Sequence, residues 1–227
     1  AYFGVPVVDA SGAMLGVVQG ADVEEAQGEA AQRTFLRFSG IIGGEELRSM
    51  PLSSRSFRRL SFLTINIFLN VIAASVIVAF ESTLAKVIAL AAFLPIISDM
   101  SGCSGSQAIA VSIRELSLGL IKPRDFTRVC LQEILVGLPN GIVLGSVLGF
   151  MAYLWKGNAY LGLVVGLALA LNTVVGVTLG GAIPLIMSRL RIDPALAAAP
   201  MLTTVTDMCG FFLSLSFAAL ALSAGKL

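Results

Sequence analysis

The chain has 227 residues, of which 56% are hydrophobic and 13% are charged, and its mean hydropathy is +0.90. Soluble domains usually carry roughly 25% charged residues, so this composition indicates an integral membrane protein. The net charge of +1 provides no basic surface for nucleic acid. Histidine is absent from the sequence, which excludes imidazole catalysis and histidine-bound zinc.

The first part of the chain, up to about residue 54, is more polar than the rest. Residues 5–18 contain two short apolar runs joined by the turn DASG, a pattern typical of a β-hairpin. A helix is expected over about residues 22–38, with Asp22 as its N-cap. Gly43 and Gly44 then stop helical structure. No signal-peptide pattern opens the chain.

The hairpin followed by a helix resembles the last third of a cystathionine-beta-synthase (CBS) domain. The resemblance rests on PVVD, a small turn, LGVV and an Asp-led helix in that order, and it covers about 25 residues. A fragment with two strands cannot bury a core by itself. We therefore expect the chain to be the C-terminal part of a longer protein.

Five apolar segments follow, each long enough to cross a hydrocarbon layer of roughly 30 Å. They lie at about residues 59–80, 83–101 with a polar continuation to 119, 129–155, 159–187 and 195–223. The sequence predicts an all-α membrane protein with five transmembrane helices per subunit and a short soluble α+β fragment at the N-terminus.

Positive charge lies mostly on one side of these spans. The connections at one face carry Arg55, Arg58, Arg59, Lys122, Arg124, Arg128, Arg189 and Arg191. The connections at the other face carry Lys86, Lys156 and Lys226. Because cytoplasmic loops are enriched in Lys and Arg, we expect a cell (inner) membrane protein with its N-terminus in the cytoplasm and its C-terminus outside.

The second span contains the polar run PIISDMSGCSGSQ (95–107), which includes Asp99. Irregular polar backbone at membrane depth is tolerated where it is buried in protein or lines water. We expect a break in the helix that lines an aqueous path; the alternative is a kinked helix that ends in an interfacial loop. Hydroxyl, carbonyl and carboxylate oxygens suit Mg²⁺ or Ca²⁺.

The fifth span contains Asp207 within TTVTDMCG (203–210), in a stretch that is otherwise uncharged from residue 195 to residue 225. A carboxylate at this depth is costly unless water, a cation or a partner meets it, so Asp207 is a candidate functional residue. Thr203 lies four residues earlier, on the same helix face. The alternative for Asp207 is a hydrogen bond between helices.

Taken together, these segments resemble the transmembrane region of the MgtE family of magnesium channels and transporters. The landmarks are FES at 80–82, the Gly/Ser-rich run that ends at Gln107, RELSLG at 114–119, DPA at 193–195, and Pro200 followed by TTVTDMCG. They occur in order over about residues 55–225. The implied domains are a CBS remnant at 1–27, a linking (plug) helix region at 28–56 and a five-span channel domain at 57–227.

The resemblance implies a homodimer in the lipid bilayer, with a Mg²⁺ pore on the two-fold axis between the second and fifth helices of each subunit. Asp207 matches the family's pore aspartate, and we expect Thr203 and Asp99 to join it as metal-contacting residues. The linking helix is expected to close the cytoplasmic mouth when intracellular Mg²⁺ is high. The other candidates for lining the pore are Gly102, Cys103, Ser104, Ser106, Ala199, Pro200, Thr204 and Gly210.

Two departures from the family pattern concern ion preference. Residues 102–106 are GCSGS where the family often has asparagines, and Ala199 stands where an Asn is common before Pro200. Because these amides are absent, Mn²⁺ and Co²⁺ remain alternatives to Mg²⁺ as the transported ion.

Two other functions are weighed against a channel. A proton- or cation-coupled carrier of divalent metals would use Asp207 as a protonation site. An intramembrane aspartyl protease would pair Asp99 with Asp207, but the YD and GxGD flanks expected of that class are absent. We expect the chain not to be an enzyme.

Overall fold

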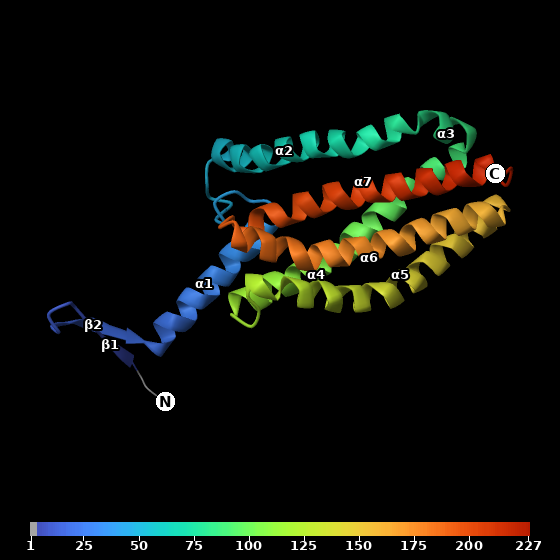
Figure 1. The fold of residues 1–227 in the computed structure, drawn as a ribbon. Coiled ribbons are helices and arrows are strands. Elements are labelled where there is room, and N and C mark those ends of the chain that lie inside the picture. Colours follow the sequence, from blue (N-terminus) through green and yellow to red (C-terminus); the bar gives the residue numbers. More distant parts are fainter. Residues whose placement is uncertain (1–3) are drawn as a thin grey trace. The chain divides into compact units, whose positions relative to one another are not determined.

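Contacts divide the chain into two compact units, Ala1–Phe62 and Leu63–Leu227, in the computed structural model. The structure describes residues 4–227, and Figure 1 shows their helices and strands in sequence colours. Each unit is described below by itself.

The first unit begins with the expected hairpin. Strand β1 (Gly4–Val8) pairs antiparallel with β2 (Met14–Gln19). The carboxylate of Asp9 holds the turn, because its Oδ1 accepts hydrogen bonds from the backbone N–H groups of Ser11 and Ala13 at 2.8 and 2.9 Å. The predicted strands and turn are confirmed, and the resemblance to a CBS domain remains an expectation.

Helix α1 (Gly20–Phe38) follows the hairpin directly, so the predicted helix is confirmed. Its N-cap is Gln19, and the prediction that Asp22 occupies this position is wrong. Asp22 lies in the first turn, where its carboxylate accepts a hydrogen bond from the backbone N–H of Gln19 at 2.9 Å. The strand continues to Gln19 and the helix starts one residue later, which places Asp22 inside the helix rather than at its edge.

The remaining helices are α2 (Leu52–Ala79), α3 (Glu81–Lys86), η1 (Ile88–Ala92), α4 (Leu94–Ser117), η2 (Pro123–Asp125), α5 (Phe126–Lys156), α6 (Ala159–Arg189) and α7 (Pro194–Ser223). Five helical segments are long and apolar enough to cross a membrane: Leu52–Ala79, Ile88–Ser117, Pro123–Lys156, Ala159–Arg189 and Pro194–Ser223. The prediction of five transmembrane helices is confirmed, and the chain is a multi-pass membrane protein.

Helix α6 is the centre of the second unit and packs against α4, α5 and α7. Glycines allow these helices to approach closely. A Cβ atom at Gly105 in α4 would lie 2.6 Å from the carbonyl oxygen of Gly176 in α6. A Cβ at Gly149 in α5 would lie 2.7 Å from the carbonyl oxygen of Gly162. Small residues thus set the contacts of α6 with its neighbours, as is common between membrane helices.

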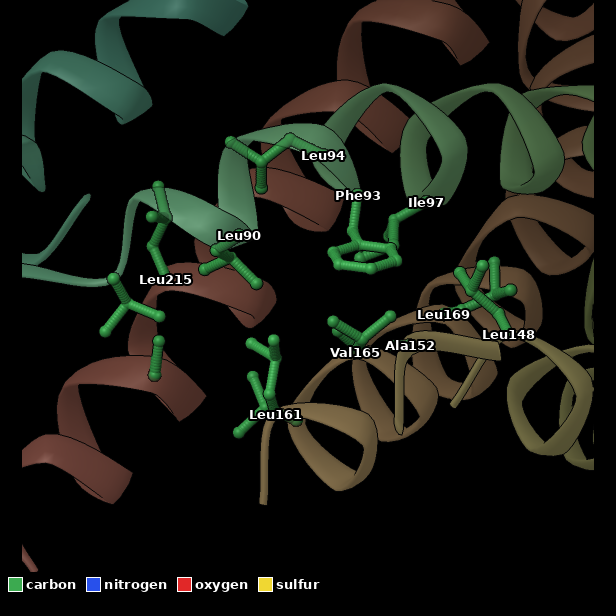
Figure 2. Packing of buried hydrophobic residues seen from close by; sticks show 14 residues of the cluster. Leu90, Phe93, Leu94, Ile97, Leu148, Ala152, Leu161, Val165, Leu169 and Leu215 are labelled. Carbon is green, nitrogen blue, oxygen red and sulfur yellow. The ribbon is translucent and has the colours of Figure 1, made fainter. Parts of the chain in front are cut away.

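Apolar side chains fill one end of this bundle. Figure 2 shows Leu90, Phe93 and Ile97 from η1 and the start of α4 lying opposite Leu161 and Val165 of α6. Ile97 and Val165 are completely buried. This cluster fixes the start of α4 against α6, and therefore the direction in which the polar residues of α4 point.

The polar run at 95–107 is helical throughout, because α4 continues without interruption from Leu94 to Ser117. The predicted break is therefore wrong. Hydroxyl groups of the run bond to their own helix: Ser101 donates to the Ile97 carbonyl at 2.7 Å, and Ser104 donates to the Met100 carbonyl at 3.0 Å. A continuous helix keeps every backbone group bonded inside a membrane, and the glycines serve as packing contacts.

Candidate ion-binding groove

A groove of about 870 Å³ lies between α4 and α7. Both carboxylates singled out from the sequence, Asp99 and Asp207, line it. Its full lining is Pro95, Ser98, Asp99, Gly102, Cys103, Ser106, Gln107, Ala110, Thr203, Asp207 and Phe211. The groove therefore combines acidic, hydroxyl, amide and thiol groups within two helices that are apolar enough to cross a membrane.

Helix α4 contributes one continuous face to the groove. Pro95, Asp99 and Cys103 are exposed and four residues apart, so they lie one above another along the helix. The opposite face of α4 carries the buried Ile97 and Ile109, which pack inside the bundle. The burial of this apolar face turns Asp99 and its neighbours outward, into the groove.

Helix α7 contributes Thr203, Asp207 and Phe211, which are also four residues apart. The N-cap of this helix is Asp193, whose Oδ1 accepts the Ala195 N–H at 2.9 Å, and Pro194 occupies the first turn. Asp207 is partly buried. The hydroxyl of Ser98 in α4 donates a hydrogen bond to Oδ1 of Asp207, so the two walls of the groove are joined at this carboxylate.

The chemistry of the groove favours a hard cation that keeps much of its water. Carboxylate, hydroxyl and amide oxygens are the ligands that Mg²⁺ and Ca²⁺ prefer. Within residues 4–227, no three His, Cys, Asp or Glu side chains gather closely enough to hold a metal ion. One chain therefore supplies two carboxylates at most, and the rest of an ion's coordination has to come from water, from neutral oxygens or from another subunit.

The structure brings together six of the residues expected at the site, and they are Asp99, Gly102, Cys103, Ser106, Thr203 and Asp207. Five expected residues do not line the groove, and they are Ser104, Ala199, Pro200, Thr204 and Gly210. Pro200 and Gly210 are buried, and a Cβ on Gly210 would point at Asn172 of α6. Their expected roles in lining a pore remain predictions.

The structure also places Ser98, Gln107 and Phe211 in the groove. The sequence indicates Ser98 and Gln107 only as members of the polar run at 95–107, and it does not single out Phe211. Two of them could have been found from the helical repeat, since Phe211 follows Asp207 by four residues and Gln107 follows Cys103 by four. Ser98 precedes Asp99 by one residue, and only the packing of α4 on α7 turns its hydroxyl toward Asp207.

The second unit matches a known protein family over most of its length. The family model for MgtE, described as a divalent cation transporter, matches residues 94–217. This range contains α4, α5, α6 and most of α7, and hence every residue of the groove.

Three curated relatives carry the name magnesium transporter MgtE. The protein of Bacillus subtilis is 31% identical over 207 residues, which is 91% of this chain and 46% of the relative. The protein of Enterococcus faecalis is 32% identical over 219 residues, 96% of this chain and 48% of the relative. That of Thermus thermophilus is 32% identical over 225 residues, 97% of this chain and 49% of the relative.

The chain thus spans about half the length of the curated relatives it matches. The family model covers more than half of the chain, including both walls of the groove. The chain belongs to the MgtE family.

Proposed function

We propose that this chain transports Mg²⁺ across the membrane along the groove between α4 and α7, with Asp207 as the carboxylate that meets the ion. The observation that carries this proposal is the position of Asp207. It lies inside an apolar helix, yet it lines a groove of about 870 Å³ that also contains Asp99. The curated relatives are named magnesium transporters, which supports Mg²⁺ as the ion; the groove's hard oxygen ligands would also accept Mn²⁺ or Co²⁺.

We propose further that the working unit is a homodimer with the pore between subunits. The groove face of α4 carries the exposed residues Asp99 and Gln107, and ionised or amide groups do not face lipid at this depth without large cost. Two copies of the groove that face each other would exclude lipid and supply four carboxylates. Two facing copies of Asp207 suit Mg²⁺, which loses its water reluctantly and takes few direct ligands.

Passive conduction down the gradient of the divalent ion is favoured over coupled transport. The groove has a volume of about 870 Å³ and is lined by several neutral oxygens, which suits the passage of a largely hydrated ion. A proton-coupled carrier would instead require flux that depends on a proton gradient. We assign a cytoplasmic N-terminus and an outer C-terminus on the basis of the basic connections at one face. Flux through a passive pore is then inward, because a negative membrane potential on the cytoplasmic side draws a divalent cation into the cell. Residues 1–27 are proposed to belong to a CBS unit, and residues 28–56 to the linking region that regulates the pore.

The test is divalent ion flux into liposomes that contain the purified chain. Asp207→Ala is expected to reduce Mg²⁺ flux at least about tenfold, equivalent to roughly 1.4 kcal/mol. Glu81→Gln, at an exposed acidic residue of α3 that does not line the groove, serves as the matched control and is expected to leave flux unchanged. Flux retained in Asp207→Ala would remove Asp207 from the mechanism. Flux that follows an imposed proton gradient would favour the coupled carrier.

The oligomeric state is tested separately. Native mass spectrometry of the detergent-solubilised chain is expected to give twice the mass of 23.7 kDa. A monomer that still conducts would contradict a pore between subunits.

A further inference from the structure

Asn172 lies in the middle of α6, the central helix of the bundle, and is completely buried. Its Nδ2 donates a hydrogen bond to the backbone carbonyl of Thr206 in α7 at 3.0 Å. Thr206 is also completely buried and directly precedes Asp207. The amide of Asn172 therefore contacts the α7 backbone one residue before the groove carboxylate.

Gly210 provides the space for this contact. A Cβ atom at Gly210 would lie 2.7 Å from Nδ2 of Asn172, closer than a side chain tolerates. One turn further along α6, a Cβ at Gly176 would meet Cγ2 of Thr206 at an ordinary contact distance of 3.4 Å. Thr206 thus packs against α6, with Asn172 and Gly176 on the α6 side and Gly210 on the α7 side.

The other end of the amide is unsatisfied. Oδ1 of Asn172 has no hydrogen-bond partner within residues 4–227, although it is shielded from solvent. An unpaired polar atom inside a membrane bundle is costly, and an apolar residue of similar shape would avoid this cost. Packing of α6 against α7 therefore does not explain why an amide side chain occupies this position, because close contacts between small residues already hold the two helices together.

We propose that Asn172 is a positioning residue that fixes the orientation of Asp207 in the groove, and through it the affinity of the site for the ion. Position 207 is held from two directions. Ser98 of α4 donates to the carboxylate, and Asn172 of α6 donates to the carbonyl immediately before it. Rotation of α7 about its own axis would break both bonds. The part of the inference that concerns ion affinity rests on the proposed function of Asp207.

The first experiment separates ion affinity from the amount of working protein. Mg²⁺ flux is measured against Mg²⁺ concentration for the reconstituted chain and for Asn172→Ala. The half-saturating concentration is expected to rise roughly fivefold, as for the loss of one positioning hydrogen bond. A residue with a purely structural role would lower the maximal flux and leave the half-saturating concentration unchanged. Asn140→Ala, at an exposed asparagine of α5, is the matched control.

A second variant perturbs the same contact from the α7 side. Gly210→Ala displaces the Asn172 amide and is expected to shift the half-saturating concentration in the same direction. The double variant Asn172→Ala/Gly210→Ala is expected to match Asn172→Ala alone, because the displaced amide is then absent. Independent, additive effects of the two substitutions would overturn the proposal.

A third measurement does not depend on transport. Asp207→Cys is placed in a background in which Cys103, Cys130 and Cys209 are replaced by serine, and its rate of reaction with a membrane-impermeant thiosulfonate is measured. Adding Asn172→Ala is expected to change this rate at least about threefold. An unchanged rate together with an unchanged half-saturating concentration overturns the inference. A changed rate combined with normal flux in Asp207→Ala supports the positioning of residue 207 and contradicts its proposed role in transport.

Discussion

The hydroxyl of Ser98 donates a hydrogen bond to Oδ1 of Asp207, and this bond joins α4 to α7 at the level of the groove. Ser98 is itself buried, whereas its neighbour Asp99 is exposed. Two adjacent residues of α4 therefore have different relations to Asp207, one as a hydrogen-bond donor and one as a second carboxylate on the same surface.

Replacing Ser98 with alanine removes a donor from the Asp207 carboxylate. We expect the half-saturating Mg²⁺ concentration to change by roughly fivefold, since a hydrogen bond of this kind contributes about 1 kcal/mol. Ser104→Ala is the matched control, because the Ser104 hydroxyl bonds to the Met100 carbonyl of its own helix and does not line the groove. Equal effects of the two substitutions in the flux assay would mean that the Ser98 contact has no special role.

Cys103 offers a direct probe of the groove. It is exposed and lines the groove, whereas Cys130 and Cys209 are partly buried. An impermeant thiol reagent is expected to label Cys103 first and to reduce Mg²⁺ flux, because the attached group occupies the path. Mass spectrometry identifies the labelled site, and Cys103→Ser is expected to conduct and to resist the reagent. Full labelling of Cys103 with undiminished flux would show that the ion takes another route.

The contact between α5 and α6 is expected to be sensitive to added volume. Gly149→Ala brings a Cβ atom to 2.7 Å from the Gly162 backbone carbonyl, which cannot move aside as a flexible side chain can. We expect the free energy of unfolding to fall by roughly 1–3 kcal/mol, which corresponds to a fall in Tm of about 2–10 °C.

Gly28→Ala is the control for this substitution. Gly28 is exposed in α1, and a Cβ atom there meets no other atom within 4 Å. Alanine is a better helix former than glycine, so this change is expected to leave Tm unchanged or to raise it. Thermal unfolding in detergent measures both variants, and an unchanged Tm for Gly149→Ala would argue against close packing of α5 on α6.

Glu46 in the first unit is expected to make the segment before α2 sensitive to acid. Its carboxylate accepts hydrogen bonds from Nε of Arg59 and Nε of Arg55, each at 3.1 Å. The bonds from Arg59, and then those from Arg55, hold the pKa of Glu46 below its ordinary value of 4.5. Because the pKa is lower in the folded chain, the stabilisation is complete above about pH 4.5 and is lost as the pH falls through the folded value.

Hydrogen exchange of residues 40–51 measures this effect. Below pH 4.5, these amides in the native chain are expected to exchange faster than the intrinsic pH dependence of amide exchange alone would give. In Glu46→Gln, faster exchange is expected already at pH 7. Glu45→Gln is the control, because Arg58 bonds to the backbone carbonyl of Glu45 and this contact survives the substitution. A similar response in the two variants would contradict a role for the Glu46 carboxylate.

The number of spans could be predicted from the sequence because it depends on local composition. A run of about 20 apolar residues is enough to cross a bilayer, whatever it packs against. The signal for the start of α7 is equally local, since Asp193 is the N-cap and Pro194 lies in the first turn. Even the position of Asp207 could be singled out, because one carboxylate in a long uncharged run is expensive wherever the run lies.

The helical conformation of the polar run in α4 has a cause outside the run itself. Gly102 and Gly105 suggest a break, because glycine loses more conformational entropy in a helix than other residues do. At membrane depth the backbone has to bond to itself, and Gly105 instead lets Gly176 of α6 approach.

Composition and hydropathy by themselves thus determined the class of protein, the five spans and the carboxylate of greatest interest, because these follow from the cost of transferring each segment into lipid. Only the tertiary structure decided which face of α4 meets α7, and hence that Ser98 bonds to the Asp207 carboxylate and Asn172 to the backbone carbonyl just before it. The bond from Asn172 spans 34 positions of the chain and the bond from Ser98 spans 109. Both depend on how three helices pack rather than on any local pattern.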